Sequence, residues 1–171
     1  MNIFIFGLLP LLFIVDRLKI RKFRFLFNFH NLKVLLDDST DINAYIIGNN
    51  LVITKGFLTL NKDEQKAILA HELAHVTLNH YNKLRSIIII SLGVSFLLFQ
   101  FNIFISLIAL IFAFLLQNYI SKKQEIEADR LAYRVVGDLL KNVIYKYGDN
   151  EIGLFSTHPN ADVRIKMLAT T

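Results

Sequence analysis

Residues 71–75 have the sequence HELAH, in which two histidines lie four positions apart and a glutamate follows the first. Histidines at positions i and i+4 of a helix share one face, where two imidazole nitrogens can bind one metal ion. The glutamate between them would lie beside a water molecule at that metal and could act as its general base. The motif therefore predicts a zinc-hydrolase centre with His71 and His75 as ligands and Glu72 as the base. The alternative is that both histidines merely face solvent or a sheet.

A catalytic zinc site usually has three protein ligands and one open position. The chain contains no cysteine, so the third ligand must be a histidine or a carboxylate. The segment QEIEAD offers Glu125, Glu127 and Asp129. Glu125 and Asp129 share a helix face, whereas Glu127 lies about 200° around the helix from Glu125. This spacing favours Glu125 as the ligand and Asp129, one turn later, as the carboxylate that orients a zinc-bound imidazole. On its own, the segment could equally be a solvated acidic patch.

The elements that would position these residues give an α+β fold. Asn61 followed by Glu64 is a capping-box pattern, and an apolar stripe continues from there to about Arg85, which predicts one helix. Residues 118–147 predict a second amphipathic helix, with Gly137 inside it. Between residues 23 and 56, short β-prone runs alternate with the turn-forming segments DDSTD and GNN. We expect a small antiparallel sheet packed on these helices, although residues 17–27 could instead form a helix.

Residues 86–117 carry no charged side chain, and the whole chain is 54% hydrophobic with a mean hydropathy of +0.45. One helix of this length would measure about 48 Å, too long for a single upright membrane span. A break at 100–102 would give a hairpin of two arms, each of about 14 residues. Small residues in both arms would allow close packing. Basic residues flank both ends and place them on the same side of the membrane. The zinc site requires the same topology, because a single span would separate Glu125 from the histidines.

Residues 1–15 are apolar except for Asn2, and a basic block at 17–24 follows them. This order favours a short membrane anchor over residues 1–16, with its basic end in the cytoplasm, although a buried or interfacial helix is the alternative. Residues 17–171 would then form one peptidase domain, interrupted by the hairpin at 86–117. We expect a multi-pass membrane protein, as in a bacterial inner membrane, whose active site faces the cytoplasm. The basic residues next to apolar segments indicate contact with a lipid bilayer, not with nucleic acid.

Three segments, in this order, resemble the HtpX and CAAX-prenyl-protease type of membrane-bound zinc endopeptidase: residues 43–76, QEIEADRLAYRV and STHPNADVRIKML. The resemblance covers roughly residues 32–170. It implies one zinc ion per chain, bound by His71, His75 and Glu125, with Glu72 as the catalytic residue. It also implies that His158 and Arg164 line the site and hold the substrate or the tetrahedral intermediate. Asn43 and Ala44 match the family's strand beside the cleft, where the substrate backbone would lie.

The predicted function is therefore zinc-dependent hydrolysis of a protein or peptide substrate, one associated with the membrane. Two other functions remain open at this stage. One is a signalling module in which the metalloprotease fold acts as a membrane sensor, and the other is a scaffold with an inactive site. His80 lies five residues after His75, about 140° away from it around a continuous helix, so we expect that it does not bind zinc.

Overall fold

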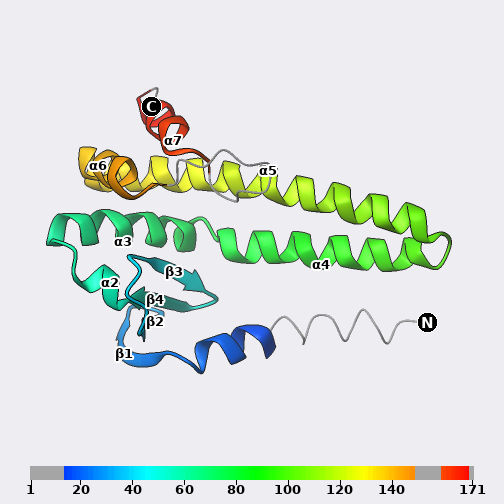
Figure 1. The fold of residues 1–171 in the computed structure, drawn as a ribbon, viewed down its shortest axis with the longest axis horizontal. Coiled ribbons are helices and arrows are strands. Elements are labelled where there is room, and N and C mark those ends of the chain that lie inside the picture. Colours follow the sequence, from blue (N-terminus) through cyan, green and yellow to red (C-terminus); the bar gives the residue numbers. More distant parts are fainter. Residues whose placement is uncertain (1–13, 149–158, 170–171) are drawn as a thin grey trace.

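The computed structural model describes residues 14–148 and 159–169. Residues 14–20 are helical, and four strands and six further helices follow (Figure 1). In chain order these are β1 (Arg24–Phe29), β2 (Leu32–Asp37), β3 (Ala44–Ile47), β4 (Asn50–Thr54), α2 (Lys55–Leu58), α3 (Lys62–Thr77), α4 (His80–Phe99), α5 (Ile103–Val136), α6 (Asp138–Tyr147) and α7 (Ala161–Leu168). The expected α+β class is confirmed. The predicted anchor falls mainly on residues 1–13, which lie outside the described residues.

The sheet is mixed, with the strand order β1-β2-β4-β3. The outer pairs β1–β2 and β3–β4 are antiparallel, but the central pair β2–β4 is parallel, so the prediction of an antiparallel sheet was wrong. After β2 the chain skips one strand position before it forms β3. The β3–β4 hairpin then folds back and places β4 in that position, between β2 and β3. Leu51, Val52 and Ile53 in β4 are all buried, which is typical of a central strand covered on both faces. As a result, β3 is an edge strand.

Helix α3 begins as the sequence predicts and ends earlier. Asn61 accepts a hydrogen bond from the backbone N–H of Glu64, and the Glu64 side chain accepts one from the Asn61 N–H, which completes the capping box. The helix was expected to continue to about Arg85 but stops at Thr77. Asn79 adopts a left-handed conformation with φ of 55°, and α4 starts at the next residue. An asparagine tolerates this conformation better than most residues, so it separates two helices that the apolar pattern had joined.

Helices α4 and α5 form the predicted hairpin, with its turn at residues 100–102 (Figure 1). The side chain of Asn102 caps α5 by accepting from the N–H groups of Phe104 and Ile105. The small residues bring the helices close together, since Ser106 Oγ donates to the Ser95 carbonyl at 2.8 Å. Within the uncharged stretch 86–117 the two arms have about the expected length, and the helices that contain them extend beyond it, to 20 and 34 residues in all. Both helices are long and apolar enough to cross a membrane.

Helix α5 does not stop at the end of the apolar stretch. It continues to Val136 as one helix of about 51 Å, where a separate helix from residue 118 had been expected. Its second half lies along α3, so the QEIEAD segment faces the HELAH motif (Figure 1). Gly137, expected inside a helix, instead ends α5 with φ of 59°. The unbroken α5 therefore joins the apolar hairpin directly to the predicted third ligand.

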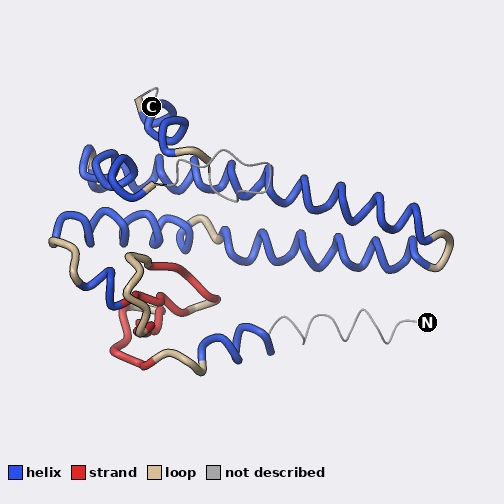
Figure 2. Tube along the Cα trace, viewed as in Figure 1, coloured by secondary structure: helices blue, strands red, loops and turns tan. Residues whose placement is uncertain are grey.

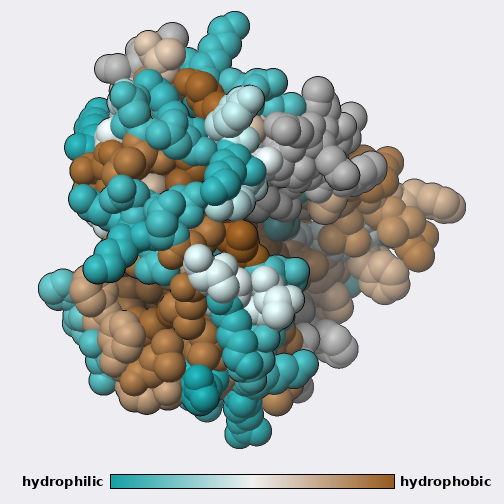
Figure 3. Space-filling model, turned by 60° about the vertical axis from the view of Figure 1, so that its left-hand side comes forward, coloured by the Kyte–Doolittle hydropathy of each residue, from teal (hydrophilic) through white to brown (hydrophobic). Residues whose placement is uncertain are grey.

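Two apolar clusters hold α3 in place from opposite sides. The sheet packs on one side of α3, and α5, α6 and α7 lie on the other (Figure 2). Ile68 of α3 packs against both clusters. In Figure 3, hydrophobic surface dominates toward the right, where the hairpin recedes, whereas hydrophilic residues cover much of the part in front. Exposed side chains such as Ile108, Ile111 and Phe112 account for this apolar hairpin surface.

Candidate metal centre

Three side chains from two helices converge where α3 and α5 lie side by side. The Nε2 atoms of His71 and His75 are 3.1 Å apart. Glu125 directs Oε2 toward His71 Nε2 and Oε1 toward His75 Nε2, each at 3.3 Å. His71, His75 and Glu125 form a group that could hold a metal ion. The structure thus brings together the three ligands that the sequence predicts.

The spacing and chemistry of these atoms fit zinc. Bonds of 2.0–2.1 Å in a tetrahedral arrangement place neighbouring ligand atoms about 3.3–3.4 Å apart. The observed separations of 3.1 and 3.3 Å are close to that value. Two imidazoles and one carboxylate are also a ligand set of catalytic zinc sites, in which the fourth position stays open for water or substrate.

Asp129 lies behind His71, on the side away from the predicted metal. Its Oδ1 atom is 2.9 Å from His71 Nδ1, and its side chain is only 1% exposed. Arg164 of α7 donates from Nε to Asp129 Oδ2 at 2.7 Å and from Nη2 to Oδ1 at 2.6 Å. A buried carboxylate is costly unless it is paired, and this two-point contact provides the pairing. Asp129 thus lies where a carboxylate could orient the His71 ring, and that role stays a prediction.

The charges around His71 affect its protonation. Burial lowers the pKa of His71, but hydrogen bonds with Asp129 and Glu125 and their negative charges outweigh it and raise the pKa to about 10. A histidine must be neutral to bind a metal, so metal binding must displace this proton. Metal affinity should therefore fall as the pH falls. Arg164 is also buried, which lowers its pKa, but Asp129 reverses the effect and the net shift is upward.

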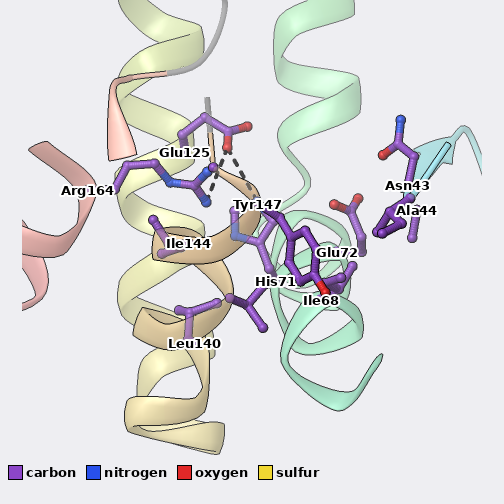
Figure 4. Close-up of a pocket in the computed structure, with 13 residues that line it drawn as sticks. Asn43, Ala44, Ile68, His71, Glu72, Glu125, Leu140, Ile144, Tyr147 and Arg164 are labelled. Atoms are coloured by element: carbon purple, nitrogen blue, oxygen red, sulfur yellow. Dashed lines mark ion pairs between the residues drawn. The ribbon is translucent and has the colours of Figure 1, made fainter. Parts of the chain in front are cut away.

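Glu72 lies on the open side of the histidines. In Figure 4, Glu72 lies between His71 and the Asn43–Ala44 segment, with Glu125 and Arg164 on the other side of His71. Two cavities, of 240 and 320 Å³, meet here, and both are lined by Asn43, Ala44, His71, Glu72 and Glu125. The predicted substrate-binding residues therefore adjoin the predicted base.

The first cavity has an apolar wall that sequence reasoning missed. Ile68 of α3 contributes to it together with four residues of α6, namely Leu140, Val143, Ile144 and Tyr147. Helix α6 does have apolar residues on one face, but that pattern alone predicts packing and does not indicate which part of the face borders a cavity. Arg164 lines the same cavity. Two of its nitrogen atoms donate to Asp129, and its contact with substrate stays a prediction. His158 lies outside the described residues.

His80 is closer to the site than the sequence suggested. It is not one of the three converging side chains, but it is 2% exposed and its Nδ1 atom lies 3.1 Å from His75 Nδ1. Its Nε2 atom faces Glu127 Oε2 at 3.4 Å. The expected angle of about 140° assumed a continuous helix. The break at Asn79 invalidates that assumption, and only the helix-breaking tendency of asparagine could have signalled it.

Comparison with known proteins agrees with this geometry. The model of peptidase family M48 matches residues 19–171. The chain belongs to peptidase family M48. Among solved structures, the M48 chain resembles Ste24p of S. mikatae with a TM-score of 0.69 and 19% sequence identity. The match covers 98% of this chain and 58% of the Ste24p chain, so the M48 chain spans little more than half of that relative. At this identity the likeness to Ste24p establishes the fold alone.

Proposed function

We propose that this M48 chain is a membrane-bound zinc endopeptidase that hydrolyses peptide bonds beside the membrane surface. The observation that carries the proposal is the convergence of His71, His75 and Glu125 at separations that suit zinc. Family membership supports it independently, because the M48 match includes both helices that supply these ligands.

A zinc ion at this position would polarise the scissile carbonyl and lower the pKa of a water molecule toward about 7. Glu72 has the position of the general base, since its carboxylate borders the open side of the ligand set and both cavities. It would accept the proton of the attacking water and pass it to the leaving amine. We assign to Arg164 and His158 the stabilisation of the oxyanion, as the resemblance implies.

The substrate would bind as an extended strand along β3. This strand pairs with β4 on one side and is at the edge of the sheet, so its other side can accept a peptide backbone. Asn43 and Ala44, at the start of β3, border both cavities, so a peptide lying there would pass directly over Glu72. The apolar wall from α3 and α6 would take an apolar side chain of the substrate.

The hairpin α4–α5 would hold this site at the membrane, and the flanking basic residues favour the cytoplasmic side for it. Membrane-associated proteins or peptides would then be the substrates. Reporter fusions at residues 60 and 135 should both report the cytoplasm, and a fusion near Gln100 should report the opposite side. Opposite locations for residues 60 and 135 would contradict both the hairpin and the metal site.

The decisive experiment compares two variants of protein purified in detergent. Glutamine is nearly isosteric with glutamate but is not a base, so Glu72→Gln should keep zinc and lose roughly 100- to 10,000-fold in peptide hydrolysis. His75→Ala should lose zinc and activity together. Hydrolysis that persists with chelator identifies a contaminating protease that needs no metal, and hydrolysis in the His75→Ala preparation identifies a contaminating metalloprotease. Near-normal hydrolysis by Glu72→Gln under these conditions would exclude the proposed mechanism.

A further inference from the structure

His80 occupies a place that the proposed mechanism does not use. It is the first residue of α4 and is almost completely buried, although it is a polar side chain. Its ring lies edge-on to that of His75, with centroids 5.0 Å apart and planes inclined at 76°. One ring nitrogen faces His75 at 3.1 Å and the other faces Glu127 at 3.4 Å. His80 therefore lies between the predicted metal ligand His75 and a carboxylate of α5.

We propose that His80 is a positioning residue for His75, and that Glu127 in turn orients His80. This inference rests on the metal site of the proposed function. Ligating histidines almost always engage their second ring nitrogen in a hydrogen bond, which fixes the orientation of the ring. His71 has Asp129 in this role, and His80 is the group that faces the corresponding nitrogen of His75.

The hydrogen positions that the contacts require agree with one another. His75 directs Nε2 toward the other ligands, so a neutral ring that binds metal there carries its hydrogen on Nδ1. Nδ1 can then donate to His80 Nδ1, which must be the acceptor. His80 consequently carries its hydrogen on Nε2, where it faces the Glu127 carboxylate. The opposite arrangement would place a hydrogen on His75 Nε2 and block metal binding.

The backbone explains why a bridging histidine is present. Glu127 lies about 200° around α5 from Glu125, so it faces away from the ligand position itself. The left-handed Asn79 breaks the helix and allows His80 to turn back toward His75. The bridge thus depends on the break between α3 and α4, where a continuous helix would have carried His80 elsewhere.

The test compares two nearly isosteric replacements in the full chain in detergent. Asparagine places its side-chain oxygen near the position of His Nδ1 and can still accept from His75, whereas leucine cannot. We expect His80→Leu to weaken zinc binding roughly 10- to 100-fold, measured by competition with a chelator of known affinity. His80→Asn should recover most of that loss. The absorption spectrum of bound Co²⁺ should change in the leucine variant and stay close to wild type in the asparagine variant.

A merely structural role for His80 predicts a different ranking of the leucine and asparagine variants. If His80 only fills space, leucine should suit the buried position at least as well as asparagine. Zinc affinity should then not depend on whether residue 80 can accept a hydrogen bond from His75. That result, with unchanged Co²⁺ spectra, would overturn the inference. Should the leucine variant not fold, Glu127→Ala provides an independent test at a half-exposed position. It should keep about one zinc per chain at saturation but bind it roughly two- to fivefold more weakly, and an unchanged affinity would also count against the bridge.

The same measurements separate this inference from the proposed function. His75→Ala tests the metal site itself, because it removes a ligand and not its support. If His75→Ala binds zinc as wild type does, the metal site is wrong and the bridge has no role. If His75→Ala loses zinc while His80→Leu and Glu127→Ala both match wild type, the metal site stands and only the bridge is excluded.

Discussion

The two histidine ligands are supported by very different surroundings. Behind His71 lies Asp129, 1% exposed and held at two points by Arg164. Behind His75 lies the ring of His80, and behind that lies Glu127, whose side chain is 41% exposed. One support is a buried ion pair that also joins α7 to α5. The other is an imidazole that leads outward to a carboxylate in solvent.

Two equivalent ligands therefore need not contribute equally to the stability of the fold. Removing one partner of a buried ion pair strongly destabilises the fold, because the charge that remains in the interior has lost its compensation. A half-exposed carboxylate can be replaced by water at little cost. We therefore expect substitutions on the His71 side to affect folding and metal binding together. Substitutions on the His75 side should mainly change metal affinity.

The largest effect is expected from Arg164→Leu. It leaves the buried Asp129 carboxylate without the two hydrogen bonds from Arg164 and with His71 as its remaining partner, which should destabilise the fold by up to about 3–5 kcal/mol. Denaturant unfolding of the chelator-treated protein measures this loss independently of zinc. The double variant Arg164→Leu with Asp129→Asn should lose less than Arg164→Leu alone, because the buried side chain at position 129 then carries no charge. A double variant less stable than Arg164→Leu would show that the ion pair does not dominate this side.

The second prediction concerns metal affinity on the same side. Asp129→Ala removes the group that orients His71, and we expect roughly a 10- to 100-fold loss of zinc affinity. This variant should also unfold more easily, because Arg164 then loses both hydrogen bonds to the carboxylate and keeps only the 3.9 Å contact of Nη2 with Glu125 Oε2. The matched change on the other side, Glu127→Ala, should leave unfolding of the chelator-treated protein unaltered. Equal unfolding behaviour in the two variants would remove the contrast between the supports.

Much of this site could be predicted from the sequence because it depends on local helix geometry. His71 and His75 are one turn apart on α3, and Glu125 and Asp129 are one turn apart on α5, so each pair shares a face whatever the rest of the chain does. The capping box at Asn61 is equally local. The hairpin followed from an apolar stretch too long for one span and from its charged flanks.

The errors arose where a single backbone conformation or a distant pairing decides the structure. The left-handed Asn79 separates α3 from α4, and the apolar stripe that runs through it gives no sign of the break. The parallel β2–β4 pair depends on how the β3–β4 hairpin folds back, which strand propensity does not encode. For the same reason the sequence did not reveal the contact of His80 with His75. That contact requires the break at Asn79 as well as the placement of α5.

The smallest effect separates the two supports by their response to salt. Glu127 is half exposed, so its influence on His80 acts partly through solvent and should be screened as the ionic strength rises. Asp129 and Arg164 are buried, and screening inside the protein is weak. The affinity difference between wild type and Glu127→Ala, roughly two- to fivefold at low salt, should therefore shrink toward onefold at about 1 M salt, where the Debye length is about 3 Å. The difference for Asp129→Ala should persist under the same conditions.

Chelator competition at matched pH measures both differences, with Lys123→Ala as the control for a general change in surface charge. If the Glu127 difference is independent of salt, its carboxylate is engaged more directly than the structure indicates, and the two supports are more alike than their exposure suggests.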